Sequence, residues 1–185
     1  METKIDKWKS KKWFNIYAPK ILGGEVIGEM PANSEKDGIG RVIKVSLSWL
    51  TKNPSHSFMT VGLRVKNVDG NSAQTELDYL EQTYSYTHSL VRRYNSAIYT
   101  VDMLKDKEGK EIALKLLVVT RNKTASPKKT AIRKSLSEFS KTYIASKSSD
   151  EFIKSVIDGS FQTDAIGRVK NIAPISKLEV KKIEL

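Results

Sequence analysis

The feature that most constrains the fold is a run of short, alternating segments joined by tight turns between residues 40 and 120. Residues 58–68 alternate apolar and polar side chains, as a half-buried strand does, and Asp69-Gly70-Asn71 follows them. Such a turn sequence favours a β-hairpin, so residues 72–77 are the predicted partner strand. The other strands predicted in this region are residues 41–47, 98–104 and 111–120. We therefore expect an antiparallel, barrel-like sheet, and the pattern leaves open whether the sheet closes into a barrel.

Apolar residues recur with a helical period on either side of the second hairpin. Tyr86, Leu90 and Tyr94 stand four residues apart, which predicts a helix with Arg92 and Arg93 pointing away from its apolar stripe. The predicted helices are residues 82–94, a segment marked by Ile132, Leu136, Phe139 and Tyr143, a segment carrying Phe152, Ile153, Val156 and Ile157, and residues 165–172. The expected fold class is α+β: an antiparallel, barrel-like β core with flanking helices and an extended basic N-terminal arm.

The last segment, residues 175–185, alternates apolar and charged residues and is predicted to be a final edge strand. Lys177, Lys181 and Lys182 would keep that edge soluble. Three parts are expected: a basic aromatic N-terminal arm at 1–20, a β-rich core with one inserted helix at 21–122, and a basic loop, helices and final edge strand packed on the core at 123–185.

The net charge of the chain limits the classes of partner that it is expected to bind. A formal net charge of +11 and a pI near 9.7 create a field that concentrates polyanions. The basic residues are spread over several elements, which favours nucleic acid bound by a folded surface over an amphipathic membrane anchor. No apolar run approaches the roughly 18 residues of a membrane span, and residues 1–12 are too charged for a signal peptide. We expect a soluble cytoplasmic protein without a membrane partner.

Few side chains are present that could perform catalysis or hold a metal ion. The chain has no cysteine, and its two histidines, His56 and His88, stand in different contexts. Two separated histidines are too few for a histidine metal cluster and make a Ser-His-acid triad improbable. His88 is expected to be a partly buried structural residue of its helix. The carboxylate pairs fall at turns or helix starts, where capping or solvation explains them. We expect no enzyme, no cofactor, no metal and no small-molecule substrate.

The densest cationic stretch is residues 121–134, which connects an apolar strand to the longest helical pattern. Its six cations, with no acid among them, are Arg121, Lys123, Lys128, Lys129, Arg133 and Lys134. A helix start offers unpaired backbone N–H groups to an anion, and the hydroxyls of Thr124, Ser126 and Thr130 add neutral donors. By itself the stretch is equally consistent with a phosphate-binding junction and with a solvated basic loop.

The first residues of the chain mix lysines with aromatic side chains. Lys9, Lys11 and Lys12 lie between Trp8 and Trp13. Indole rings can stack on bases while lysines neutralise phosphates, so this segment is a candidate nucleic-acid arm. The alternative is that the aromatic residues dock the arm on the core. We expect docking by the apolar side chains, Phe14 and Ile16, and RNA contact by the lysines.

Several motifs occur in the order found in one known family. They are residues 12–19 (Lys-Trp-Phe-Asn-Ile-Tyr-Ala-Pro), 40–47 (Gly-Arg-Val-Ile-Lys-Val-Ser-Leu), 91–94 (Val-Arg-Arg-Tyr), 124–134, and Ile166-Gly167 leading to 172–175. The chain resembles the small-subunit ribosomal protein family shared by archaea and eukaryotes and called S-one-e, or S-three-a in older usage. Ala173 departs from the aromatic residue common at that position, which leaves the local packing or contact there open. The end at Leu185, without the long eukaryotic tail, indicates an archaeal-type member.

The resemblance implies a structural role rather than catalysis. Members of this family sit on the platform of the small subunit near the exit of the messenger RNA and the 3′ end of the ribosomal RNA, and have a β-rich, barrel-like core. It therefore implies binding of small-subunit ribosomal RNA and contact with neighbouring platform proteins in the cytoplasm, with messenger RNA as a further candidate. The alternative is a free RNA-binding assembly or translation factor. The residues expected to bind RNA are Lys9, Lys11, Lys12, Trp13, Arg41, Arg92, Arg93, Arg121, Lys123, Lys128, Lys129, Arg133 and Lys134.

Overall fold

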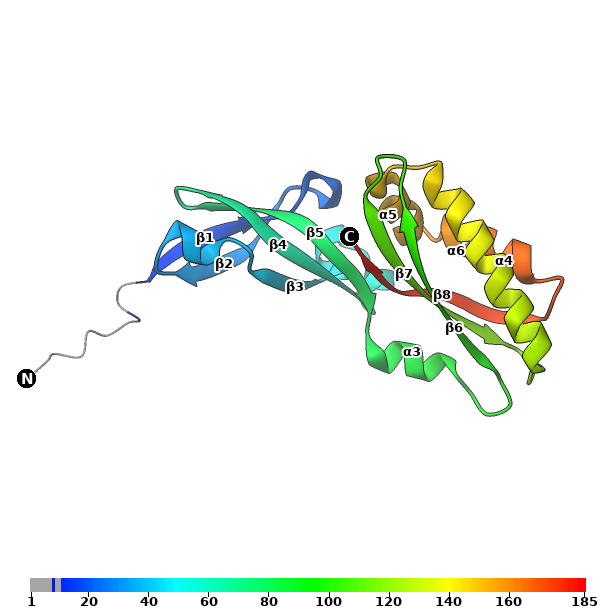
Figure 1. Cartoon of the computed structure of the whole chain (residues 1–185). Coiled ribbons are helices and arrows are strands. Elements are labelled where there is room, and N and C mark those ends of the chain that lie inside the picture. Colours follow the sequence, from blue (N-terminus) through cyan, green and yellow to red (C-terminus); the bar gives the residue numbers. More distant parts are fainter. Residues whose placement is uncertain (1–7, 9–10) are drawn as a thin grey trace, which may run out of the picture. The chain divides into compact units, whose positions relative to one another are not determined.

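A computed structural model describes residue 8 and residues 11–185 of the chain (Figure 1). The strands are β1 (Lys12–Tyr17), β2 (Val26–Ala32), β3 (Val42–Ser46), β4 (Met59–Asp69), β5 (Ser72–Gln82), β6 (Ala97–Lys105), β7 (Glu111–Thr120) and β8 (Ile175–Glu184). The α-helices are α1 (Glu35–Gly38), α2 (Leu47–Thr51), α3 (Tyr84–Leu90), α4 (Ser126–Ala145), α5 (Ser149–Ile157) and α6 (Ser160–Val169), and two short 3-10 helices are η1 (Lys20–Leu22) and η2 (Pro54–His56). The predicted α+β class is confirmed.

The chain divides into two compact units, unit 1 (Met1–Asp78) and unit 2 (Tyr79–Leu185). Hydrogen bonds link the strands in the order β2-β1-β5-β8-β7-β6, with β4 paired to β5 and β3 paired to β4. Most of these pairings are antiparallel, and β1 with β5 is parallel. The sheet is mixed and mostly antiparallel.

The barrel-like form predicted for the β core is wrong, because the sheet does not close: β2 and β3 remain edges of the sheet in unit 1 and do not pair with each other among the described strands. Pro31 in β2 lacks the N–H group that a further ladder would need. A side chain makes the connection instead: the Arg41 guanidinium donates a hydrogen bond to the Pro31 carbonyl at 3.0 Å.

Unit 1 confirms the predicted hairpin. β4 and β5 are joined through Gly70, whose φ of 59° lies in the left-handed region that glycine adopts without a Cβ penalty. β5 continues to Gln82, beyond the predicted partner segment. β2 was not among the predicted strands, and Gly28 lies inside it.

The predicted N-terminal arm is wrong from residue 12 onward. Residues 12–17 form β1, which pairs with β2 and β5, while residues 1–7, 9 and 10 lie outside the described residues. Phe14 and Ile16 are only 2% and 4% exposed and pack with Met30 and Val65 in the core of unit 1. The docking predicted for these two side chains is therefore confirmed.

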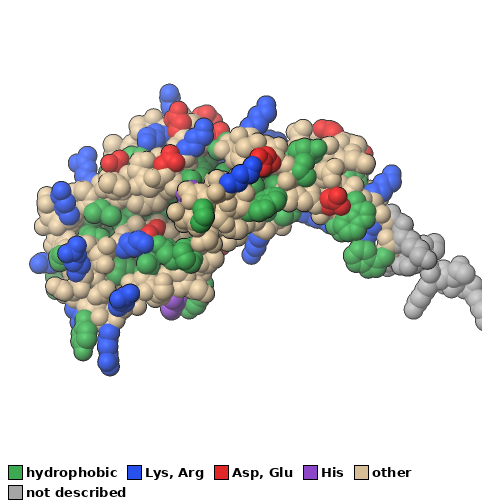
Figure 2. All heavy atoms as spheres, turned by 180° about the vertical axis from the view of Figure 1, so that it is seen from behind, with side chains coloured by type: hydrophobic (Ala, Val, Ile, Leu, Met, Phe, Trp, Pro, Cys, Tyr) green, Lys and Arg blue, Asp and Glu red, His purple; other side chains and the backbone are tan. Residues whose placement is uncertain are grey.

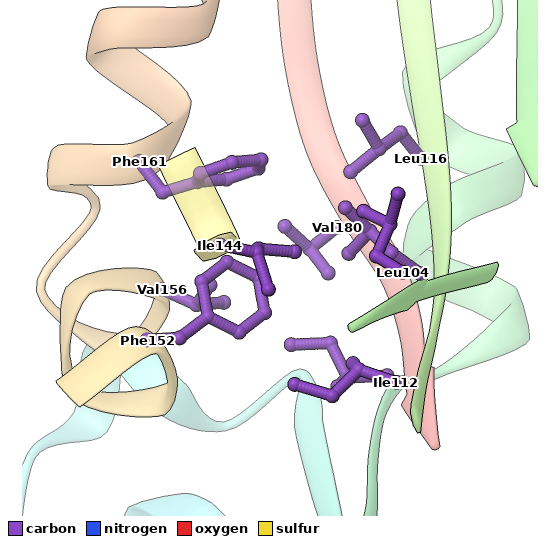
Figure 3. Packing of buried hydrophobic residues seen from close by; sticks show 10 residues of the cluster. Leu104, Ile112, Leu116, Ile144, Phe152, Val156, Phe161 and Val180 are labelled. Atoms are coloured by element: carbon purple, nitrogen blue, oxygen red, sulfur yellow. The ribbon is translucent and has the colours of Figure 1, made fainter. Parts of the chain in front are cut away.

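Unit 2 buries its core between strands and helices. α4 packs on β6 and α6 packs on β8 (Figure 1). Figure 3 shows Phe152 and Phe161, from α5 and α6, facing Leu116 and Val180 of the sheet. Burying aromatic side chains of this size is a main source of stability for a unit of this size.

Local sequence signals place the helices of unit 2. Ile132 and Leu136 are fully buried on one stripe of α4, as their spacing predicts. α5 begins with a capping box, in which the Ser148 hydroxyl accepts from the Glu151 N–H and the Glu151 carboxylate accepts from the Ser148 N–H.

Three further expectations about unit 2 are wrong. β8 is not an edge strand, because it lies between β5 and β7. The helix expected to reach Tyr94 ends at Leu90, so Arg92 and Arg93 lie in a loop. His88 is exposed on α3, with its ring centroid 4.2 Å from that of Tyr84.

Candidate nucleic-acid interface

Two loops meet at one end of unit 2. Residues 91–96 lead from α3 into β6, and residues 121–125 lead from β7 into α4 (Figure 1). The hydroxyl of the buried Thr120 donates to the Asn122 carbonyl at 2.7 Å and accepts from the Ser96 N–H at 3.1 Å. The Thr124 N–H donates to the Ser96 hydroxyl at 3.1 Å. Neutral hydroxyl and backbone groups therefore fix both loops.

Eight cations surround these loops and the first turns of α4, and we call this group the cationic end. Its members are Arg92, Arg93, Arg121, Lys123, Lys128, Lys129, Arg133 and Lys134. All are exposed except the half-buried Lys129. Within the described part of the chain, none of the eight forms an ion pair with a carboxylate. Figure 2 shows Lys and Arg side chains gathered on the surface of unit 2. The charge of the cationic end is thus available to an external anion.

Arg133 is held in place by the edge of the sheet. Its Nε donates to the Tyr99 carbonyl of β6 at 3.3 Å. The half-exposed Tyr99 ring also lies 5.3 Å from the Lys181 Nζ. The predictions missed Tyr99 and Lys181, because these two side chains come together only when β6 and β8 both pair with β7. Their alternating positions within two strands were the available signal.

The start of α4 adds backbone donors to this surface. Its first residues include Pro127, and its N-cap, Ala125, makes no side-chain capping hydrogen bond. The N–H groups of the first turn therefore lack a side-chain acceptor beside Lys128 and Lys129. Two of the predicted neutral donors form hydrogen bonds with backbone carbonyls nearby in the chain. Thr124 Oγ1 donates to the Asn122 carbonyl, and Thr130 Oγ1 donates to the Ser126 carbonyl.

The remaining predicted contact residues lie in unit 1. Lys11 Nζ is 3.8 Å from the Trp8 ring centroid, a cation–π contact. Lys12 is exposed and Trp13 is 57% exposed. Arg41 is exposed but directs a guanidinium nitrogen at the Pro31 carbonyl. These four side chains belong to unit 1, whereas the cationic end belongs to unit 2; Lys9 lies outside the described residues.

The lysines of β8 contrast with the cationic end. Lys177 pairs with Glu179 at 3.1 Å, and its hydrogen bond to the Tyr86 hydroxyl raises the pKa of Lys177 above the ordinary value. Lys182 pairs with Glu184 at 2.9 Å; this hydrogen bond raises the pKa of Lys182 and lowers the pKa of Glu184. Neighbouring carboxylates therefore neutralise these lysines.

Other kinds of site find little support in the described residues. Over residues 8 and 11–185, no group of three His, Cys, Asp or Glu side chains is placed to hold a metal ion. In the same part of the chain, no helix is both long and apolar enough to cross a membrane.

The features above define a class of protein: a basic α+β chain with a cluster of uncompensated cations on a fixed surface, as proteins that bind nucleic acids have. The chain belongs to the Ribosomal S3Ae family, whose model matches residues 1–185. The resemblance stated from its sequence motifs is confirmed.

Relatives from several archaea are similar over nearly the whole chain. The small ribosomal subunit protein eS1 of Pyrobaculum aerophilum is 34% identical over 183 residues, covering 99% of this chain and 83% of the relative. The protein of that name from Pyrobaculum calidifontis is 36% identical over 183 residues (99% and 82%), and that from Methanococcus maripaludis is 32% identical over 180 residues (97% and 80%).

Family membership makes the chain a structural ribosomal protein that serves in translation. The prediction that it is not an enzyme is confirmed on this ground, as is its expected place on the cytoplasmic ribosome. Its partners are, in general terms, ribosomal RNA and ribosomal proteins.

Proposed function

We propose that this chain binds small-subunit ribosomal RNA through the cationic end of unit 2 and helps to build the platform of the small subunit near the messenger RNA exit. The observation that carries the proposal is the absence of ion pairs at all eight cations in the described chain, while Lys177 and Lys182 of the same unit are paired. Uncompensated cations on a fixed surface lower the free energy of binding phosphate most effectively.

The mechanism is electrostatic docking followed by recognition of shape. The arginines and lysines neutralise phosphates and release their counterions, which provides affinity without base specificity. The loops are held by buried hydrogen bonds at Thr120 and Ser96, so the cations are presented in a fixed pattern to a preformed RNA surface. Lys11, Lys12, Trp13 and Arg41 remain proposed RNA contacts of unit 1. Neighbouring platform proteins are the further proposed partners, with messenger RNA as an additional candidate.

Salt dependence of RNA binding tests the electrostatic part of the proposal. If about 6 to 10 phosphates are contacted, affinity for small-subunit ribosomal RNA fragments falls by roughly 10³ to 10⁵ between 50 and 200 mM salt. Filter binding or fluorescence anisotropy over this range measures the slope. An affinity that hardly changes with salt would contradict the proposal.

Charge reversal locates the binding surface. Lys128→Glu with Lys134→Glu is expected to weaken RNA binding by at least about tenfold and to reduce incorporation into small subunits, because two phosphate contacts become repulsive. The matched control is Lys107→Glu with Lys110→Glu, which makes the same charge change at exposed positions in the turn at the opposite end of β6 and β7. Equal losses for the two variants would assign the effect to net charge and reject the surface.

A free RNA-binding factor would have the same kind of basic surface, so location separates the two functions. Sucrose-gradient sedimentation of a cell lysate is expected to show the chain in equimolar amounts with small subunits after a moderate salt wash. Migration with free protein or only with precursor particles would instead support an assembly or translation factor.

A further inference from the structure

Tyr94 adopts a backbone conformation that a side chain of its size rarely tolerates. Its φ of 72° lies in the left-handed region, and within the described chain only Lys52 shares this among non-glycine residues. The ring is not buried in compensation, because Tyr94 is 69% exposed. A strained backbone that displays an aromatic ring to solvent indicates a function outside the isolated fold.

The surrounding loop holds this conformation. The Asn95 N–H donates to the Arg92 carbonyl at 3.2 Å and closes a tight turn around Tyr94. The next residue, Ser96, is buried and is bonded to Thr120 and Thr124. The backbone position of Tyr94 is thus fixed before any ligand arrives, which reduces the entropy lost on binding.

Three cations belong to the two loops at the exposed ring. Lys123 Nζ lies 6.0 Å from the Tyr94 ring centroid, and Arg92 and Arg93 precede Tyr94 in the same exposed loop. None of these three cations has a carboxylate partner within the described residues. An aromatic face flanked by unpaired cations has the two elements of a single-strand site: a stacking surface for a base and counter-charges for the adjoining phosphates.

We propose that Tyr94 is a stacking platform for one unpaired base of single-stranded RNA, with Arg92, Arg93 and Lys123 binding the phosphates on either side. This inference rests on the proposed RNA-binding function and adds that the cationic end binds single-stranded RNA. A base within a duplex has both faces covered by its neighbours, so the ring can stack only on a loop, bulge or end. The faces of all four bases are aromatic, so little sequence preference follows.

The test compares single-stranded with duplex RNA as probes for the full chain. A 12-nucleotide uridine oligomer and a 12-base-pair RNA duplex, each fluorescently labelled, are titrated at one salt concentration. Tyr94→Gly relieves the backbone strain while removing the ring. It is expected to keep or raise the melting temperature, to weaken binding of the oligomer by about 5- to 100-fold, and to leave duplex binding within about twofold.

Two further measurements separate stacking from a loss of loop structure. Tyr94→Phe retains the ring and is expected to bind the oligomer within about threefold of the original chain. An oligomer with a central 2-aminopurine is expected to lose fluorescence on binding the original chain, and much less on binding Tyr94→Gly, because stacking quenches this base.

The outcomes distinguish the two proposals. If the original chain binds neither probe in a salt-dependent manner, the RNA-binding function itself fails. If it binds both probes and Tyr94→Gly binds the oligomer equally well, only the stacking platform is overturned. Reduced incorporation into small subunits by Tyr94→Gly, with unchanged affinity for the oligomer, would also overturn it and would assign the ring to a protein contact.

Discussion

The two ends of the hairpin formed by β6 and β7 are held by different chemistry. At the turn end, residues 106–110, the Asp106 carboxylate accepts hydrogen bonds from the Glu108 and Lys110 N–H groups, each at 2.9 Å, and from the Ser149 hydroxyl. At the cationic end, the hydroxyls of Thr120 and Ser96 hold the loops.

This difference shows how a fold keeps charge available for a ligand. A carboxylate that fixes a loop also brings a negative charge, which neutralises nearby cations. Hydroxyl groups fix a loop with no net charge, so the eight cations of the cationic end keep their full field. The comparison predicts that changes at the turn end alter stability, whereas changes at the cationic end alter RNA binding.

The largest effect on stability is expected from Asp106→Ala. It leaves two backbone donors and the start of α5 without their acceptor, which costs about 3 kcal/mol in the free energy of unfolding. Urea denaturation measures this loss, and RNA affinity should stay within about twofold. Glu108→Ala, an exposed carboxylate in the same turn, is the control and should change stability by less than about 0.5 kcal/mol. An equal loss for both variants would contradict the role given to Asp106.

Thr120→Val should have the next largest effect, because it replaces the buried hydroxyl by a methyl group of similar size. The Ser96 N–H and the Asn122 carbonyl lose their partner, at a cost of about 2 kcal/mol. RNA affinity should also fall, although no charge changes, since the loops lose their fixed positions. Thr142→Val, on the exposed face of α4, is the control. If Thr120→Val reduces stability but leaves RNA affinity unchanged, RNA binding by the cations does not depend on the fixed loops.

A smaller, pH-dependent effect is expected from Asp106→Asn. The hydrogen bond from Ser149 is the main cause that lowers the pKa of the Asp106 carboxyl below its ordinary value. A carboxyl with a lowered folded-state pKa stabilises the fold above its unfolded pKa of about 3.9, and this contribution disappears as the pH falls through the folded-state value. The stability difference between the original chain and Asp106→Asn should therefore shrink below about pH 4. Urea midpoints at several acidic pH values test this; a constant difference would contradict it.

The smallest expected effect is on the salt dependence of RNA binding, when single lysines at the two ends of the hairpin are replaced. Lys134→Gln removes one exposed cation of the cationic end and should reduce the slope of log affinity against log salt by about 1, with little change in stability. Lys110→Gln, at the turn end, should leave the slope unchanged. Binding isotherms at four or more salt concentrations measure both, and equal slopes would remove the distinction between the two ends for RNA.

Local patterns predicted the elements better than their arrangement. The stripe of Ile132 and Leu136 identified α4, and the turn at Gly70 identified the β4–β5 hairpin, since both depend on residues close in sequence. The same reasoning carried the predicted helix on to Tyr94, although the helix ends at Leu90. Tyr94 has the helical spacing, but its φ of 72° is not helical. Ser96, two residues later, forms hydrogen bonds with Thr120 of β7 and with Thr124 of the following loop, and these contacts are distant in sequence.

The candidate site was predicted in part for the same reason. Residues 121–134 could be recognised as a candidate RNA-binding stretch because their six cations lie close together in the sequence, with no acid among them. Arg92 and Arg93 were found through their motif, but their place beside Lys123 required the contacts between the two loops. The roles of Arg133, bound to the Tyr99 carbonyl, and of Arg41, bound to the Pro31 carbonyl, depend on partners distant in sequence.

The sequence by itself determined the excess of positive charge, the α+β class, the hairpin turns and the family, because composition, short-range periodicity and ordered motifs carry that information. Only the tertiary structure decided that β8 lies inside the sheet, that β2 and β3 stay open, and which cations lack a carboxylate neighbour. The physical reason is that strand neighbours and ion pairs depend on long-range contacts, whose free energies no local pattern records.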